Sequence, residues 1–344
     1  MTLVAVLALV ASACGRGGGD NATTTTKRET TTTADPRVPA PLSGRLIDPA
    51  EAARPVVMVK VDNSPNGRPQ AGIDKADLLV EEMVEGSVTR FIAFFHSDDT
   101  DLVGPIRSIR TTDPNIVAPF GGVFVFSDGV PRVVNLIKSV PVTGVYEMLG
   151  AAPFKYPSGR QRPYKTFAST ERLRQEAPSG AKAPPALVLF QAPGDEAVGA
   201  SATPAEKVTV VFGSRTTAGL EWSENTGAWL RSTNGTSHLT ADGTRLGFTS
   251  AIIQYVTYVS AGYRDAAGSV VEEAKVVGTG EGIALINGQQ FPIKWSKASP
   301  TAVTTYTDSA GSPLRLPVGP VLIMLPRSGS QTSITAPTTS TTQP

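Results

Sequence analysis

The sequence predicts an α+β chain: a mixed α/β domain over residues 44–190, followed by an all-β domain over residues 206–327. First, strand-like apolar runs alternate with short helical patterns in the earlier segment. Second, the later segment has apolar runs separated by turn signals and no convincing helix, which indicates a sandwich or a partly open barrel. Third, Pro, Gly and Ala dominate the residues between the two segments, and we place the linker at residues 191–205.

In the first domain, the patterns predict strands at residues 55–62, 76–84, 88–96 and 122–127 and helices at residues 113–119, 131–139 and 169–176. Asp113 and Pro114 suit the start of the first helix. In the second domain, we expect strands at residues 207–212, 228–231, 251–259, 273–277, 282–286, 291–295 and 321–325. Asn287-Gly288 lies between two apolar runs, which strongly favours a hairpin.

Both ends of the chain differ in composition from the folded part. Residues 1–13 are an apolar run ending in small residues, typical of a secretory signal peptide and too short to span a bilayer. Cys14 follows Ala11-Ser12-Ala13, which resembles the lipobox of bacterial lipoproteins, so residues 1–14 predict lipidation at Cys14. Residues 15–43 are rich in Thr, Gly and Pro and predict a disordered tether, and residues 328–344 predict a disordered tail.

Charge and cysteine content narrow the function classes. The net charge of +1 gives no basic field for nucleic acid. The single Cys excludes an intramolecular disulfide and a CxxC metal site. No cofactor and no metal is expected, although Asp62, Glu81, Glu85 and Asp128 offer hard oxygen ligands as an alternative.

Charged side chains cluster beside the predicted strands of residues 56–110. Because strand ends and turns commonly carry binding residues, we expect a ligand site there. The candidate residues are Asp62, Asn63, Arg68, Gln70, Glu82, Glu85, Arg90, Arg107, Arg110 and Asp128.

Glu82 shares a strand face with apolar residues, so its carboxylate requires a partner. The candidate partners are Arg68, Arg90, Arg107 and Arg110. We expect Arg107 to pair with Glu82 or Glu85 as a structural residue, and Arg110 to face an anionic or polyhydroxylated ligand.

Two enzymatic alternatives stay open. Glu81 and Glu82 point to opposite strand faces, so a glycosidase pair would need one of them together with Glu85. His96 could serve a Ser-His-Asp arrangement, but no nucleophile-elbow motif accompanies it. We expect His96 to be an edge or surface residue and His238 to be a surface residue beside a turn.

The chain contains an ordered string of motifs: Val59–Asn63, Arg68–Gly72, Ala76-Asp77, Glu85-Gly86, Thr89–Phe91, Gly104–Arg110, Gly280–Ala284, Trp295–Lys297 and Gly311–Gly319. This string resembles the DUF3048 family of YerB-like envelope lipoproteins. The chain departs from the family at residues 162–166, where many relatives carry Pro-His-Asn. The resemblance covers both predicted domains and implies no established activity.

Together, these observations predict a surface-tethered, extracytoplasmic lipoprotein that is not an enzyme. We expect it to be attached to the cell membrane through its lipid anchor and to bind an envelope component or a partner protein through the charged turns of the first domain. The alternative is a hydrolase or transferase that acts on cell-wall glycan or peptide through carboxylates of that domain.

Overall fold

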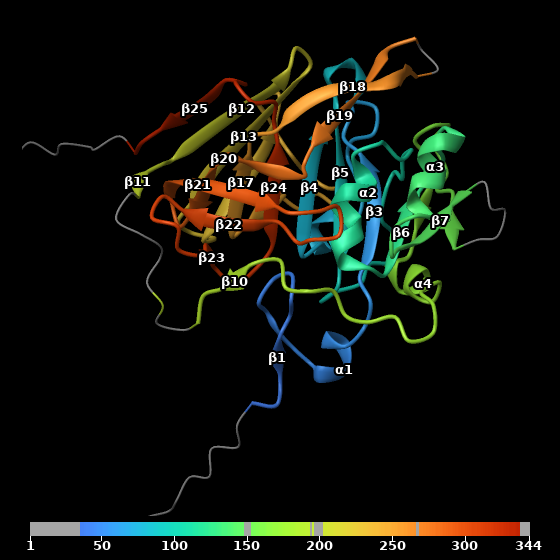
Figure 1. Ribbon diagram of the computed structural model, residues 1–344, viewed down its shortest axis with the longest axis horizontal. Helices are drawn as coiled ribbons and strands as arrows, with labels where there is room; N and C mark the ends of the chain where they lie inside the picture. Colours follow the sequence, from blue (N-terminus) through green and yellow to red (C-terminus); the bar gives the residue numbers. More distant parts are fainter. Residues whose placement is uncertain (1–34, 148–152, 193–194, 196–201, 266–267, 338–344) are drawn as a thin grey trace, which may run out of the picture. The chain divides into compact units, whose positions relative to one another are not determined.

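A computed structural model describes residues 35–147, 153–192, 195, 202–265 and 268–337 of the chain (Figure 1). The predicted signal peptide, Cys14 and residues 15–34 of the predicted tether lie outside this part, as do most of the predicted linker and residues 338–344. None of the described helices has the length and apolar character needed to cross a membrane.

The described chain is mostly β. The helices are α1 (Pro49–Ala52), α2 (Asp113–Val117), α3 (Pro131–Ile137) and α4 (Thr170–Arg174), with single turns η1 (Ile73–Lys75), η2 (Glu85–Ser87) and η3 (Ala118–Phe120). The earlier strands are β1 (Val38–Pro39), β2 (Leu46–Ile47), β3 (Val57–Asp62), β4 (Leu78–Met83), β5 (Thr89–Phe95), β6 (Val123–Phe126), β7 (Thr143–Tyr146), β8 (Phe154–Lys155), β9 (Phe167–Ala168) and β10 (Leu189–Phe190). The later strands are β11 (Thr203–Pro204), β12 (Lys207–Gly213), β13 (Thr216–Ser223), β14 (Ala228–Thr233), β15 (Thr236–Ser237), β16 (Gly247–Phe248), β17 (Ser250–Gln254), β18 (Thr257–Arg264), β19 (Val270–Lys275), β20 (Gly278–Ile286), β21 (Gln289–Lys297), β22 (Thr305–Asp308), β23 (Arg315–Leu316), β24 (Val321–Leu325) and β25 (Thr332–Thr335).

One eleven-stranded sheet contains strands from both predicted domains. Its order is β11-β21-β20-β17-β24-β4-β5-β3-β6-β7, with β22 paired to β21. β24 runs parallel to β4, so that Val321 lies opposite Leu78 and Leu325 opposite Glu82. Figure 1 shows the red β24 beside the blue β4. The described residues from Pro36 onward form one compact unit, and the predicted domain linker at residues 191–205 stays a prediction.

The middle strands are buried along their whole length. Every residue of β3, β4 and β5 is buried, because these strands have neighbours on both sides and packed layers on both faces. β5 is antiparallel to β3 and β4, whereas β6 is parallel to β3 and β7 is parallel to β6. The predicted strands of the first domain are confirmed, with ends that differ by one or two residues.

The later strands are divided between sheets. A six-stranded sheet has the order β15-β14-β13-β12-β25, with β16 paired to β14. β17, β20, β21, β22 and β24 join the central sheet instead, so the pairing does not confirm a sandwich or barrel closed within residues 206–327. The predicted hairpin is confirmed: Asn287 and Gly288 have φ values of 48° and 69° between β20 and β21. A Cβ atom on Gly288 would lie 2.8 Å from the Trp222 ring, which explains the need for Gly.

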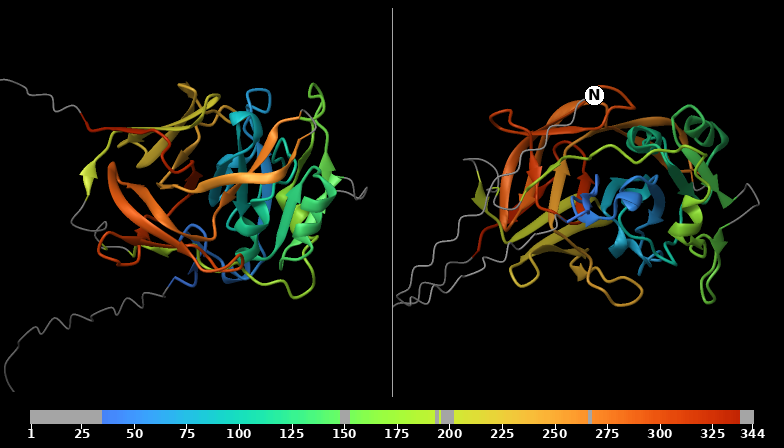
Figure 2. Two further views of the ribbon diagram at one scale, coloured as in Figure 1. Left: turned by 45° about the horizontal axis from the view of Figure 1, so that its top comes forward. Right: turned by 90° about the horizontal axis from the view of Figure 1, so that it is seen from below.

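Two later strands depart from the prediction. Residues 251–259 do not form one strand, because the chain leaves the central sheet after Gln254 and starts β18 at Thr257. β13 was not predicted, since its Thr, Ala, Gly and Glu residues give a weak apolar pattern. β18 and β19 form a separate two-stranded ribbon, which Figure 2 shows extending over the central sheet.

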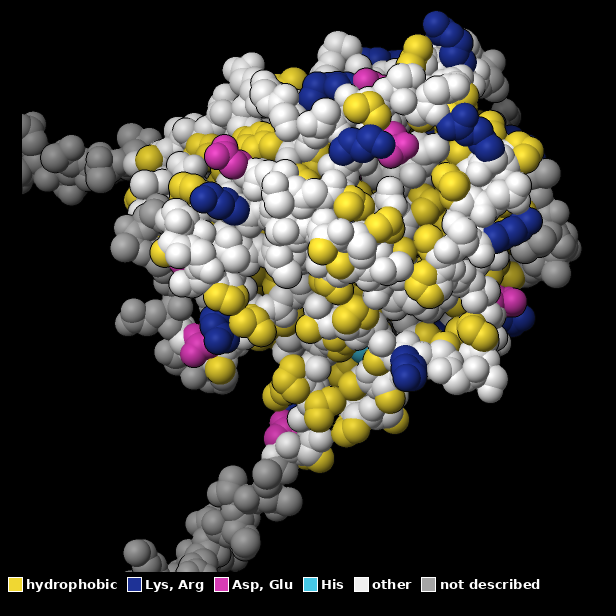
Figure 3. All heavy atoms as spheres, viewed as in Figure 1, with side chains coloured by type: hydrophobic (Ala, Val, Ile, Leu, Met, Phe, Trp, Pro, Cys, Tyr) yellow, Lys and Arg dark blue, Asp and Glu magenta, His cyan; other side chains and the backbone are white. Residues whose placement is uncertain are grey.

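Charged side chains are spread over the face of the molecule shown in Figure 3. On the face shown in Figure 3, Lys and Arg lie singly or beside Asp and Glu, with apolar side chains between them. This matches the balanced net charge of +1. Any charged site therefore depends on local arrangement and not on the field of the whole molecule.

Candidate functional site

The carboxyl ends of the parallel strands β3, β6 and β7 lie together at one edge of the central sheet. β3 ends at Asp62, β6 is followed by Ser127 and Asp128, and β7 is followed by Glu147. We call these four residues the carboxyl edge. Ligands commonly bind beyond the carboxyl ends of parallel strands, so this edge is the first place to look for a site.

The Gly104–Arg110 segment is held between β3 and the chain that follows β6. Arg107 donates its backbone N–H to the Lys60 carbonyl at 2.8 Å and accepts from the Ser127 N–H at 3.0 Å. Ile109 donates to the Asp128 carbonyl at 3.0 Å. Through these hydrogen bonds the Gly104–Arg110 segment lies between β3 and the chain after β6, where the two strands diverge. The Arg107 side chain is thereby placed at the carboxyl edge.

Arg107 forms an ion pair with Asp62. The Arg107 side chain is 18% exposed, whereas that of Asp62 is 2% exposed. The Arg107 guanidinium also lies 5.3 Å from the centre of the Tyr164 ring, a cation–π contact. The predicted pairing of Arg107 with Glu82 or Glu85 is wrong, because the end of β3 is nearer to the 104–110 segment than β4 is.

Glu85 forms ion pairs with two arginines near the carboxyl edge. Arg110 donates Nε to Glu85 at 2.7 Å and Nη2 to its other oxygen, and Arg90 lies 3.7 Å away. Burial raises the pKa of Glu85, but the hydrogen bonds and charges of Arg110 and Arg90 outweigh it and lower the pKa to about 2. Burial and the charges of Arg110 and Arg107 lower the pKa of Arg90 to about 10. Arg110, predicted to face a ligand, is thus engaged by Glu85 and is 12% exposed.

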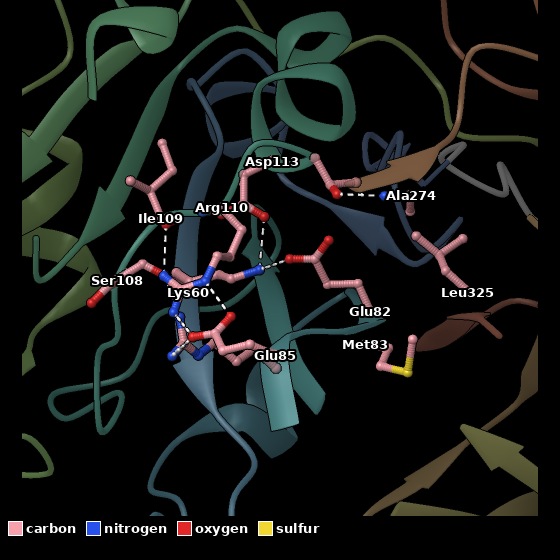
Figure 4. A network of polar contacts seen from close by, with 12 residues as sticks. Lys60, Glu82, Met83, Glu85, Ser108, Ile109, Arg110, Asp113, Ala274 and Leu325 are labelled. Carbon is pink, nitrogen blue, oxygen red and sulfur yellow. Dashed lines mark hydrogen bonds and ion pairs between the residues drawn. The ribbon is translucent and has the colours of Figure 1, made fainter. Parts of the chain in front are cut away.

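Glu82 lies in the core with Lys60 and Asp113 (Figure 4). Lys60 donates to Glu82 Oε1 and, at 2.7 Å, to Asp113 Oδ1, and all three residues are buried. Burial raises the pKa of Glu82 to about 8, and Asp113 adds to this rise against the effect of Lys60. The predicted arginine partners of Glu82 are wrong, because Lys60 on β3 occupies the same sheet face.

Asn63 and Gln70 belong to a second buried network on the opposite face of β4. Glu81 accepts two 2.9 Å hydrogen bonds from Arg231 and one of 3.1 Å from Asn63. Gln70 donates to Asn63 Oδ1 at 3.1 Å and lies 2.9 Å from His238 Nε2. This network joins the first predicted domain to β14 of the second.

Both histidines are buried, so the predictions of an edge or surface position for His96 and a surface position for His238 are wrong. His96 is fully buried, and its Nε2 lies 3.1 Å from the Arg54 carbonyl. His238 lies between Thr233 Oγ1 and Gln70 Oε1, each at 2.9 Å. Packing of the 64–70 loop against β14 and β15 covers His238, a long-range contact that the local sequence does not reveal.

The structure therefore separates the predicted site residues into groups. Those at or directly below the carboxyl edge are Asp62, Glu85, Arg90, Arg107, Arg110 and Asp128. Asp128 is exposed and accepts a hydrogen bond from Ser108. Glu82 lies in the core, Asn63 and Gln70 lie in the network with Glu81, and Arg68 lines a hollow described below.

Sequence reasoning missed four residues that complete these networks: Lys60, Asp113, Tyr164 and Arg231. Lys60 had a usable signal, because a Lys in the middle of an otherwise apolar strand requires an acidic partner. The described residues contain no group of three or more His, Cys, Asp or Glu side chains that could hold a metal ion.

The comparisons with protein families and with known proteins agree with one another. The family model for the N-terminal domain of DUF3048, a protein of unknown function, matches residues 42–182, and the C-terminal model matches residues 208–323. The "Putative lipoprotein YerB" of Bacillus subtilis (strain 168) is 36% identical over 103 residues, which are 30% of this chain and 31% of that protein. The chain thus matches less than a third of this curated relative's length.

A solved structure extends the comparison to most of the fold. The crystal structure of YerB protein from Bacillus subtilis has a TM-score of 0.73 against this chain at 22% sequence identity. The match covers 86% of this chain and 100% of that chain. At this identity the likeness shows a shared fold and does not assign a ligand.

Proposed function

The chain belongs to the DUF3048 family, and we propose that it is a lipid-anchored envelope protein that binds an anionic polymer of the cell envelope through the basic connection between β8 and β9, beside the carboxyl edge. The lipid would be attached at Cys14, which lies outside the described residues. Two features support anchoring: the lipobox-like run before Cys14 and the lipoprotein name of a relative. The Thr- and Gly-rich segment after Cys14 would act as a tether.

The connection between β8 and β9 carries the binding proposal. Residues 154–168 contain four basic side chains, Lys155, Arg160, Arg162 and Lys165, and no acidic one. The same connection contributes Tyr164, which contacts Arg107 at the carboxyl edge. Basic groups interleaved with tyrosines suit a polymer that offers both negative charge and sugar rings.

Contacts with the rest of the protein hold some of the four basic side chains in place and leave others exposed to solvent. Arg160 donates to the Pro69 carbonyl at 2.6 Å and lies 5.2 Å from the Phe167 ring centre, so it anchors the connection. Arg162 reaches Glu147 at 2.8 Å but is 70% exposed. Lys165 lies 5.0 Å from the ring centre of the exposed Tyr156. Arg162 and Lys165 are therefore the cations best placed to meet a polymer.

The acidic residues that the alternative hydrolase would use are bound to basic side chains. Glu81 and Glu82 are fully buried, and each is bound to a cation. Glu85 is bound to Arg110, and Asp62 to Arg107. A glycosidase requires two carboxylates that flank an accessible bond, so this arrangement favours binding over hydrolysis.

Sedimentation with purified cell walls tests the proposal. The whole chain with Cys14→Ala removes the anchor, so any sedimentation reports polymer binding. We expect it to sediment with walls at low salt and to be released as salt rises, because counterions screen exposed charge pairs. The double variant Arg162→Glu, Lys165→Glu should remain in the supernatant.

A matched control reverses two charges elsewhere. Arg172→Glu with Lys182→Glu makes the same change of charge at two exposed positions and should sediment like the parent. Equal loss in both double variants would mean that only net charge matters. Unchanged sedimentation of the Arg162, Lys165 variant would contradict the proposal.

A further inference from the structure

A surface hollow of about 360 Å³ lies beside the 64–70 loop, where this loop meets the β14–β15 turn. Its lining is Pro65, Arg68, Pro69, Thr233, Asn234, Thr236, Ser237, His238 and Leu239. The volume lies at the lower end of the range for small-molecule sites. None of the lining residues is acidic, and one is a cation.

Arg68 is the cation, and among the described residues its guanidinium interacts with Arg231, Glu81 and Asp62 only through their charges. It is half-buried, yet its side chain makes no hydrogen bond and no ion pair with any other described residue. Burial lowers the pKa of Arg68, and the charge of Arg231 lowers it further. A partly desolvated guanidinium with open donors is a strong receptor for carboxylate or phosphate oxygens.

The surrounding charges leave the hollow positive. The nearby Arg231 is neutralised by Glu81, and Asp62 is neutralised by Arg107. Arg245 lies opposite Leu239 in an isolated β-bridge, and its buried Nε has no hydrogen-bond partner among the described residues. Asp62 and Glu81 are thus each paired with another arginine, and they act on Arg68 through their charges without a direct contact.

His238 contributes a neutral wall. Gln70 donates its amide to Asp62 O and Asn63 Oδ1, so its Oε1 accepts from His238 Nε2–H. Thr233 Oγ1 then donates to His238 Nδ1. Both ring nitrogens are satisfied within the protein, and burial with the charges of Arg231 and Arg68 lowers the pKa of His238 to about 3.

The remaining lining offers hydroxyls and apolar surface. Thr236 and Ser237, on the exposed strand β15, make no side-chain hydrogen bond to other described residues. Pro65, Pro69 and the 44% exposed Leu239 supply apolar contacts. A guanidinium and two hydroxyls suit the several oxygens of a phosphate, and the apolar walls suit a ring-sized body.

We propose that this hollow binds a small organic phosphate, with Arg68, Thr236 and Ser237 on the phosphate and Pro69 and Leu239 against the ring. This goes beyond the proposed function, since it concerns a small molecule and different residues. Polymer binding through Arg162 and Lys165 could fail while this site persists, and the reverse holds as well.

Calorimetric titration of the whole chain carrying Cys14→Ala tests the site with inositol monophosphate, inorganic phosphate and inositol. We expect saturable binding of inositol monophosphate, weaker binding of phosphate and none of inositol. Arg68→Gln should weaken inositol monophosphate binding by about tenfold to a hundredfold, because hydrogen bonds to a charged group are lost. Ser237→Asp, at an exposed position, should abolish binding by repulsion.

Arg172→Gln is the matched control, because it removes a guanidinium from an exposed site on α4 and should leave binding unchanged. Melting curves establish that each variant is folded. Three outcomes would overturn the proposal: no saturable binding of any probe up to about 10 mM, well above a millimolar Kd; equal affinity for inositol and its phosphate; or unchanged affinity in both Arg68→Gln and Ser237→Asp.

Discussion

Lys60 and Glu82 face each other inside the central sheet, where their side chains are 0% and 1% exposed. Asp113 contacts the same ammonium, so one buried cation serves two buried carboxylates. Glu82 Oε2 has no hydrogen-bond partner among the described residues. Since a buried charge without a full set of partners is costly, the protonation state of Glu82 should affect the stability of the fold.

The first prediction concerns Glu82→Gln and pH. The pKa of Glu82 rises from 4.5 to about 8 in the folded state, mainly through burial. A raised pKa contributes stability that is fully present below pH 4.5 and is lost as pH rises through 8. Glu82→Gln should therefore match the wild type near pH 4.5 and become relatively more stable toward pH 8. Denaturant titrations across this window measure the difference, and parallel curves would mean that the pKa of Glu82 is not raised on folding.

The second prediction concerns Lys60→Met. This change leaves the Asp113 carboxylate buried beside Glu82 without the shared cation, and we expect the free energy of unfolding to fall by roughly 3–5 kcal/mol. Adding Glu82→Gln and Asp113→Asn removes both acidic groups and should recover most of that loss. Chemical denaturation of the single and triple variants checks this. A triple variant no more stable than Lys60→Met would show that packing around the Lys60 stem is the larger effect.

The third prediction concerns Arg110→Gln and acid stability. The folded pKa of Glu85 is lowered to about 2 from 4.5, so its contribution is present above pH 4.5 and is lost as pH falls toward 2. A shift of this size corresponds to on the order of 3 kcal/mol for an almost buried side chain. Arg110→Gln should remove most of this contribution and flatten the acid limb of the stability curve. An unchanged acid limb would argue that Arg90 alone sustains the low pKa.

The sequence predicts the central strands well, because β3, β4 and β5 have strong apolar runs with clear turns after them. It cannot show that Val321–Leu325 pairs with Leu78–Glu82, since a parallel pairing over such a long separation has no local signal. The shared sheet therefore emerges only from the three-dimensional structure.

The candidate site could likewise be predicted only in part from the sequence. The clustering of charges near residues 56–110 is visible in the sequence, but the partners are not. Glu82 required a cation, and its partner is Lys60, on the same face of the sheet, and not an arginine. Arg231 reaches Glu81 from a strand 150 positions away, so no local pattern could predict it. The burial of His238 also depends on a contact with a residue far away in the sequence, Gln70, so no local pattern could predict it.

The fourth prediction concerns Cys14→Ala. If Cys14 carries the lipid, this change should move the protein from the membrane fraction to the soluble fraction of cells that express it. The reason is that the variant lacks the thiol to which the lipid would be attached. Membrane fractionation followed by immunoblotting measures the shift. Ser12→Thr, close to Cys14 and similar in chemistry, is the control. Wild-type membrane content in Cys14→Ala would contradict lipid anchoring at this residue.

The last prediction concerns brief proteolysis with elastase. The segment between Gln191 and Ala202 is rich in small residues, which elastase prefers, so we expect cleavage there after removal of the two ends. Each side is held by backbone pairs: Gln191 N–H donates to Leu316 O at 2.9 Å, and β11 pairs with β21. The parallel pairing of β24 with β4 lies in the buried centre of the shared sheet. The two fragments should therefore elute together in size-exclusion chromatography without denaturant and separate only in denaturant. Separation under native conditions would show that the two halves are independent domains.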